Sequence, residues 1–329
     1  MEPPVQFDFL IENHYLESDI ISLLDKYGLT AEKTLQVEYT LAIAKPEFKQ
    51  EEKIDDWASK LLAGQDHQLY VTGYDGTVSC LQIVEGQLRR MQVSKVSKQP
   101  LTNLNKLTNE YITASGYDGR VMLFNVEHQE MELALEFTME SEFCPILSMC
   151  SFYTVHQPYT VLLNELNQLR ILKPLQYLSK KDDTISLQLN DKNNLQRAPK
   201  VPDVAMKVQL NFDALSLAQY SQQELLIGTK QSIQLFDLDG QQSVRALPAP
   251  APCTTFNTLK SGLVLGGFMD RSVRLYDIRR PDPVVRTFKG HKSHVVALRP
   301  HWENENRFTT CEVAGKALVW DLRATIPYH

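Results

Sequence analysis

A short pattern that returns six times along the chain restricts the fold more than any other feature. Each copy has an apolar run, a tight turn and a second, alternating strand that ends near a bulky residue. Three clear copies are LYVTGYDGTVSCLQI at 69–83, YITASGYDGRVMLFNV at 111–126 and LVLGGFMDRSVRLYDI at 263–278. Weaker copies lie at 159–173, 225–238 and 308–322. Self-similarity of this kind indicates a repeat architecture in which each copy is one supersecondary unit.

The spacing of the turns identifies the kind of repeat. Asp75 and Asp118 are 43 residues apart, which is close to the ~40–45 residues of a four-stranded propeller blade. One longer interval, of 63 residues, predicts a polar insertion near 174–205. Asp-Gly pairs at 75–76 and 118–119 are typical of tight hairpins, which need a positive φ. We therefore predict that Asp75, Asp118 and Asp270 lie between the second and third strands of three different blades.

Composition and charge exclude several classes of protein. Hydrophobic residues make up 43% of the chain, which excludes global disorder. The formal net charge of −6 excludes a basic footprint over the whole chain, although not a local basic patch. Five scattered cysteines without a CxxC motif predict free thiols in a reducing compartment. With no signal-peptide pattern and no long apolar window, we expect an intracellular protein outside the membrane.

Motifs for catalysis or cofactor binding are missing from the sequence. It contains no nucleophile elbow, P-loop, HExxH motif, EF-hand loop or dinucleotide-binding glycine pattern. His291, His294 and His301 lack partners with metal-ligand spacing, so we interpret them as one structural histidine and two loop histidines. The acidic run EEKIDD at 51–56 is interpreted as a solvated linker. We predict a protein that is not an enzyme and binds no cofactor.

The first 44 residues differ from the repeats. A strand in VQFDFLIEN, a helix in DIISLLDKY and a strand in LQVEYTLAI are predicted, with Ser18 as the N-cap of the helix and Gly28 as its stop. So few residues do not bury a core of their own comfortably. We predict a small module at 1–44, a linker at 45–62 and the repeats at 63–329.

Two sequence stretches near the C-terminus resemble the WD-repeat signature. FKGHKSHVVALRP at 288–300 supplies the Gly-His step, and ALVWDLR at 317–323 supplies the Trp-Asp dipeptide. In that family a His, a Ser or Thr, a turn Asp and the Trp form a hydrogen-bonded network within a blade. The resemblance implies that His291, Thr309 or Thr310, and Trp320 have these roles, and that Asp75, Asp118 and Asp270 also stabilise blades. Because Ala314 replaces the turn Asp of this repeat, we expect the network to be incomplete.

The module and the repeats together resemble one group of proteins. FDFLIEN, LLDKYGLTAEKTLQVEYTLA, DDWASKL and TGYDGTV, in this order, are similar to the WD-repeat ribosome-assembly factors of the PeBoW complex. The resemblance implies an all-β, seven-bladed propeller preceded by an α+β ubiquitin-like module, which Notchless proteins share. Six repeats are readable here, and the module resembles a truncated one that starts at its third strand. We therefore expect the last blade to lack a strand or to borrow one.

The resemblance also implies a function and partners. It implies a non-enzymatic scaffold of large-subunit ribosome assembly and pre-rRNA processing, in the nucleolus and nucleoplasm of the nucleus. The propeller would dock on the propeller of the block-of-proliferation protein, join pescadillo, and so bind the pre-ribosomal large-subunit particle. The module would bind the AAA ATPase midasin, with Glu32 completing the coordination of a Mg²⁺ ion held by midasin. A Notchless-type assembly factor and a substrate receptor of a ubiquitin ligase are the alternatives.

Overall fold

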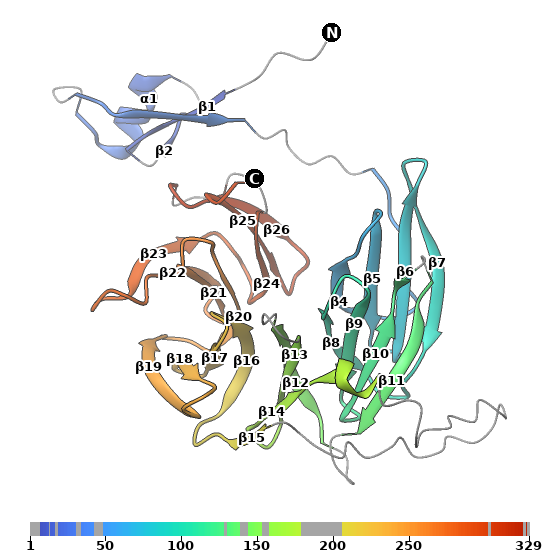
Figure 1. Ribbon diagram of the computed structural model, residues 1–329. Coiled ribbons are helices and arrows are strands. Elements are labelled where there is room, and N and C mark those ends of the chain that lie inside the picture. Colours follow the sequence, from blue (N-terminus) through green and yellow to red (C-terminus); the bar gives the residue numbers. More distant parts are fainter. Residues whose placement is uncertain are drawn as a thin grey trace. The chain divides into compact units, whose positions relative to one another are not determined.

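The computed structural model describes residues 7–12, 14–16, 19–30, 34–42, 49–127, 130–138, 144–152, 158–178, 206–301, 304–324 and 327. It divides into two compact units, one of residues 49–250 and one that combines residues 1–48 with 251–329. Each unit consists mainly of antiparallel sheets (Figure 1). None of the helices in these ranges has both the length and the apolar character needed to cross a membrane.

The unit of residues 49–250 contains four antiparallel sheets of four strands each. The first strands of these sheets, β4 (Ala58–Ala63), β8 (Leu101–Lys106), β12 (Ile146–Phe152) and β16 (Ala214–Gln219), lie side by side in sequence order. In the third sheet, the short 3₁₀ helix Pro174–Tyr177 follows the third strand. The first and second sheets are β4 (Ala58–Ala63), β5 (Gln68–Gly73), β6 (Thr77–Val84) and β7 (Gln87–Lys95), then β8 (Leu101–Lys106), β9 (Tyr111–Gly116), β10 (Arg120–Asn125) and β11 (Glu132–Thr138). The third and fourth are β12 (Ile146–Phe152), β13 (Tyr159–Asn164), β14 (Gln168–Leu172) and β15 (Met206–Gln209), then β16 (Ala214–Gln219), β17 (Glu224–Thr229), β18 (Ser232–Asp237) and β19 (Gln242–Pro248).

The other unit contains the fifth and sixth sheets and the N-terminal module. β24 of the sixth sheet lies beside β20 and β21 of the fifth. Among the described residues the sixth sheet has three strands, whereas the other five repeat sheets have four. The expectation that the last blade lacks a strand or borrows one stays a prediction. The strands are β20 (Cys253–Thr258), β21 (Val264–Phe268), β22 (Ser272–Tyr276) and β23 (Val284–Lys289), then β24 (Val295–Pro300), β25 (Arg307–Glu312) and β26 (Ala317–Asp321).

All six sequence copies correspond to the second and third strands of a sheet. They form β5–β6, β9–β10, β13–β14, β17–β18, β21–β22 and β25–β26, each pair antiparallel. The predicted insertion falls between β14, which ends at Leu172, and β15, which begins at Met206. The predicted fold class, a nearly all-β chain built from blade-like sheets of the WD-repeat type, is confirmed.

The predicted linker needs one adjustment. Strand β4 begins at Ala58 and pairs with β5, so residues 58–62 belong to the first sheet although they were expected in the linker. The pairing of Leu61 with Val71 shows the register. The sequence AxxLLA is short and only weakly alternating, which is why it did not stand out as a strand.

Strand β10 shows why the repeat strands are apolar on both faces. Val121, Met122, Leu123 and Phe124 are all completely buried. Met122 and Phe124 pack with residues of the first sheet, whereas Val121 and Leu123 pack with residues of the third. Because successive side chains point to opposite faces, a strand between two sheets needs apolar residues at every position. Each such side chain contributes about 1.5–3 kcal/mol through burial.

The N-terminal module is a small α+β unit. Its strand β1 (Phe7–Ile11) lies between β2 (His14–Tyr15) and β3 (Val37–Leu41), and helix α1 spans Ile20–Tyr27. Asp19 caps the helix by accepting a hydrogen bond from the Ser22 backbone N–H, whereas the predicted cap, Ser18, lies outside the described residues. Gly28 ends the helix at a φ of 64°, as predicted.

The core of this module is small. Only Leu23 and Leu24 of the helix are buried, and the neighbouring Ile21 is 71% exposed. On the sheet, the large apolar side chains that remain substantially exposed are Phe7, Phe9, Val37, Tyr39 and Leu41. The module therefore leaves much of its apolar surface accessible, as expected for so short a segment.

Candidate functional site

The turn aspartates lie where the repeat spacing predicts them. Asp75, Asp118 and Asp270 each stand between the second and third strands of a different sheet. The Asp75 carboxylate accepts hydrogen bonds from the backbone N–H and the hydroxyl of Thr77, at 3.1 and 2.7 Å. Asp270 accepts the same pair of bonds from Ser272. These carboxylates satisfy turn backbone groups, so their geometry indicates a structural role.

Asp118 also links two neighbouring sheets. Its carboxylate accepts a hydrogen bond of 2.6 Å from the hydroxyl of Ser97, which follows the last strand of the first sheet. Arg120 forms an ion pair with Asp118 at 2.8 Å and a second with Glu136 on β11. The turn of the second sheet is thereby fixed to the first sheet and to its own outer strand.

A buried polar network crosses the sixth sheet and its entry loop. Trp320 Nε1 donates to the hydroxyl oxygen of Thr310 at 2.7 Å, and Thr310 lies 2.6 Å from His291 Nε2. His291 Nδ1 lies 3.0 Å from a carboxylate oxygen of Glu312. Because that carboxylate can only accept, Nδ1 carries the proton, and the neutral ring then accepts from Thr310 at Nε2. Of the two candidate threonines, the structure selects Thr310.

The expectation that this network is incomplete was wrong. Ala314 occupies the turn, but Glu312, two residues earlier, supplies the missing carboxylate. The same oxygen of Glu312 accepts hydrogen bonds from the backbone N–H groups of Lys292 and Ser293, at 2.7 and 3.2 Å. The glutamate side chain is one methylene longer than aspartate, so it reaches the histidine from the end of β25. Pattern matching at the turn position alone could not reveal this substitution.

The network predicts a dependence of stability on pH. Burial lowers the pKa of His291 below its ordinary 6.5, against the opposing effect of Glu312. The unfolded chain therefore binds a proton more readily than the folded one below pH 6.5, and the free energy of unfolding should decrease as pH falls through this range. Urea titrations at pH 7.5 and 5.5 should show a smaller decrease for His291→Gln than for the unmodified chain. The exposed His67→Asn variant should keep the full dependence, and an equal slope in all three proteins would contradict this role of His291.

The predicted metal ligand Glu32 lies outside the described residues. The structure describes the elements on either side of it, which are helix α1, ending at Gly28, and strand β3, beginning at Val37.

Two arginine side chains, from the sixth sheet and the residues just after it, contact strand β3. The Arg307 guanidinium donates to the backbone carbonyl of Leu41, and Arg323 lies 3.6 Å from the Glu38 carboxylate. The module thus has a polar contact with the last sheet.

The acidic run at 51–56 has partners on the first sheet. Arg90 on β7 lies 2.9 Å from Asp55 and 3.7 Å from Glu52. The Gln50 amide exchanges two hydrogen bonds with the backbone of Leu88, at 2.8 and 2.6 Å, as a neighbouring strand would. This segment covers part of the outer edge of β7, and covering of this kind limits edge-to-edge association.

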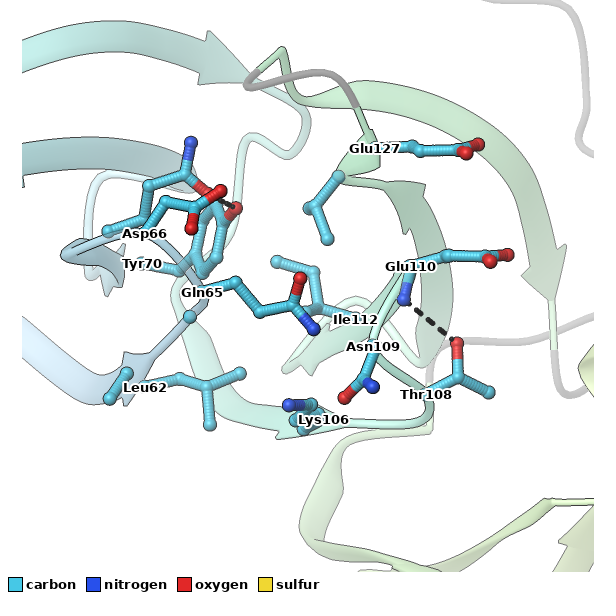
Figure 2. A pocket seen from close by; sticks show the side chains of 14 residues that line it. Leu62, Gln65, Asp66, Tyr70, Lys106, Thr108, Asn109, Glu110, Ile112 and Glu127 are labelled. Carbon is cyan, nitrogen blue, oxygen red and sulfur yellow. Dashed lines mark hydrogen bonds between the residues drawn. The ribbon is translucent and has the colours of Figure 1, made fainter.

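A groove of about 280 Å³ lies between the first and second sheets (Figure 2). We call it the acidic groove, because its charged lining residues are Asp66, Glu110 and Glu127 against the single cation Lys106. The loop between β4 and β5 forms one wall, and the loop between β8 and β9 forms the other. Apolar side chains lie beneath these residues, namely Leu62, Tyr70, Ile112 and Val126.

The floor of the acidic groove depends on a glycine. Tyr70 is 2% exposed, and its hydroxyl donates to the Gln68 amide oxygen at 2.6 Å. A Cβ atom at Gly64 would lie 2.6 Å from the Tyr70 ring, so a larger residue there would displace the tyrosine. Figure 2 shows the Gln65 side chain reaching toward the middle of the groove. No sequence pattern predicts this groove, since its residues come from separate repeats.

The described residues include no clustered metal ligands and no activated thiol. No group of three or more His, Cys, Asp or Glu side chains in these ranges is arranged to hold a metal ion. All five cysteines are free thiols, and four of them are buried. Burial raises the pKa of the Cys150 and Cys253 thiols, which keeps them protonated and poorly nucleophilic.

Comparison with known proteins identifies relatives that match this chain over all or nearly all of its length. The chain is 27% identical, over all its residues and 79% of the other protein, to "Ribosome biogenesis protein YTM1" of Candida glabrata. It is 25% identical over the same shares to the protein of that name in Saccharomyces cerevisiae. It is 22% identical to "Ribosome biogenesis protein WDR12 homolog" of Arabidopsis thaliana, over 98% of the chain and 77% of that protein. No protein-family model matches the chain. These relatives confirm the resemblance to WD-repeat ribosome-assembly factors that the sequence motifs indicate.

Proposed function

We propose that this protein is a non-enzymatic scaffold in assembly of the large ribosomal subunit. The premise is that its relatives, which match along the whole chain, are ribosome biogenesis proteins. The full-length similarity carries the proposal. It covers both the N-terminal module and the repeat sheets, so the combination of the two is shared, and not only a common repeat.

The fold and its surfaces support a scaffold. Within each unit, turns with hydrogen-bonded side chains and buried cores hold the successive sheets together, and the grooves described above are open and lined by charged and amide side chains. Propellers of this kind commonly carry function at surface sites grafted on a constant frame. We propose that the repeat region docks on the block-of-proliferation protein, joins pescadillo and enters the pre-ribosomal large-subunit particle in the nucleolus and nucleoplasm.

The module would provide the second contact. Glu32 would offer a carboxylate oxygen to the Mg²⁺ ion of midasin, because a hard divalent cation with an open position takes such a ligand. The pulling force of that ATPase would then act on the scaffold through the module. The support for this step is the similarity of KYGLTAEKTLQVEY to the ubiquitin-like modules of the assembly factors.

Affinity purification tests the function as a whole. The tagged chain should co-purify with large-subunit precursor particles containing pre-rRNA, and a repeat-region partner should remain bound after RNase treatment. Recovery of cullin-type ligase subunits in place of ribosomal precursors would instead support a substrate receptor.

The Glu32 contact has its own test. Glu32→Ala should abolish Mg²⁺-dependent binding of the full chain to the isolated adhesion-site domain of midasin, and chelation of the ion should have the same effect. Glu32→Asp should weaken binding, because the shorter side chain holds its carboxylate farther from the Mg²⁺ ion, which binds oxygen ligands at about 2.1 Å. Asp25→Ala, at an exposed position of α1, is the matched control. A titration in which Glu32→Ala binds as tightly as the unmodified chain would exclude this role.

A further inference from the structure

Charge is distributed very unevenly along this chain. Residues 251–329 contain 12 Lys and Arg against 7 Asp and Glu, a formal net charge of +5. Residues 1–250 contain the remaining 22 basic and 33 acidic residues, a net charge of −11. The overall value of −6 therefore conceals a basic C-terminal part. Such asymmetry between parts of a chain is typical of proteins in which one part binds a polyanion.

Two acidic side chains of residues 251–329 are buried and have hydrogen-bond partners within the fold. Glu312 is 4% exposed and is held by His291 and two backbone N–H groups. Asp321 is 1% exposed and forms two hydrogen bonds with Arg323. Asp321 and Arg323 cancel each other, and Glu312 is directed inward, so the net positive charge of this part is carried by its other basic side chains.

A groove of about 270 Å³ lies within this part, between the fifth and sixth sheets. We call it the basic groove, because its described charged lining residues are the cations Lys260 and Arg299 against the single acid Glu305. The loop between β20 and β21 and the C-terminal end of β24 form its walls. The buried Leu259 and Leu298 belong to the core cluster of these sheets and hold both walls in place.

The basic side chains of this groove can bind phosphate. Arg299 is exposed, and within the described residues its guanidinium has no hydrogen-bond or ion-pair partner. Lys260 lies 4.0 Å from Glu305, with both side chains more than half exposed, so this pair is weak and easily exchanged for a phosphate contact.

The acidic groove provides an internal comparison. Both grooves lie between successive sheets and are formed by the loops that join the first and second strands of each sheet. Their volumes are similar, at about 280 and 270 Å³. Their charges are opposite, with three acids and one lysine in one and one acid with Lys260 and Arg299 in the other. The difference in charge therefore comes from the side chains and not from the architecture of the repeat.

We propose that the basic groove is an RNA-binding site that contacts the phosphate backbone through Lys260 and Arg299. The choice of RNA as the polyanion rests on the proposed function, because a pre-ribosomal particle presents RNA at high local density. Contacts of this kind are independent of base sequence and depend strongly on salt. The scaffold thus binds the particle directly as well as through protein partners.

Binding of a fluorescent, mixed-sequence single-stranded RNA to the full chain tests the site. Lys260→Ala with Arg299→Ala should weaken binding about tenfold at low salt and reduce the slope of log K against log salt by about 1.4, from two lost phosphate contacts. Lys106→Ala in the acidic groove is the matched control and should change neither value. Both altered side chains are exposed, so the thermal midpoint should be unchanged.

The outcomes separate this site from the proposed function. In cells the double variant should still co-purify with precursor particles but should lose its ultraviolet crosslinks to rRNA. An RNA affinity equal to that of the unmodified chain would overturn the proposal, as would tighter binding of an acidic peptide than of RNA at the same salt. Failure of the unmodified chain to co-purify with precursors would instead count against the proposed function, even with RNA binding intact in solution.

Discussion

Gly76→Ala should destabilise the protein strongly, by about 3 kcal/mol or more. Gly76 follows Asp75 in the turn of the first sheet and has a φ of 80°, where a residue with a Cβ atom is strained. A Cβ atom there would also lie 2.2 Å from the backbone oxygen of Ser97. Ser97 cannot move away easily, because its hydroxyl donates to Asp118 and accepts from the Gln99 N–H.

Gly86→Ala is the matched control for this substitution. Gly86 has nearly the same φ, 77°, in the turn between β6 and β7, but a Cβ atom there would meet no other atom within 4 Å. It should therefore show only the backbone cost, about 1 kcal/mol. Chemical denaturation followed by circular dichroism measures both, and the difference between the two variants isolates the steric clash. Equal losses would show that the turn backbone shifts to accommodate the methyl group.

Much of the repeat fold could be predicted from the sequence because its determinants are local. An Asp-Gly pair imposes a hairpin through positive φ, and apolar residues at every position of VMLF in β10 require burial on both faces. These signals repeat at a nearly constant interval, so each copy supports the others. The six strand pairs were therefore found, including the weak copy at 159–173.

The features that were missed depend on residues far apart in the sequence. Glu312 replaces the turn aspartate only because the entry loop at 291–293 folds onto the end of β25. The two grooves take their residues from neighbouring repeats, and their opposite charges disappear in the total of the whole chain. Strand β4 has a weak pattern of its own and is defined by pairing with β5. Tertiary contacts decide each of these, and a pattern at one position does not carry that information.

The polar network of the sixth sheet leads to the second large expected effect. Thr310→Val keeps the volume and β-branched shape of the side chain but removes the hydroxyl that joins Trp320 Nε1 and His291 Nε2. Thr310 and Trp320 are fully buried and His291 is 8% exposed, so water cannot replace the lost partner. Each of the two buried polar groups left without a partner costs about 1–3 kcal/mol, so the free energy of unfolding should fall by about 2–6 kcal/mol.

Thr309→Val provides a control at the next position of the same strand. Thr309 lies on the opposite face of β25, is exposed, and faces Val319 across the strand pair. A β-branched replacement there should change the free energy of unfolding by no more than about 0.5 kcal/mol. Urea denaturation of both variants at pH 7.5 gives the comparison, and a similar small loss in each would mean that the buried hydroxyl is not needed. A large loss confined to Thr310→Val would establish that this sheet is held by its polar network as well as by apolar packing, since the substitution leaves the apolar contacts in place.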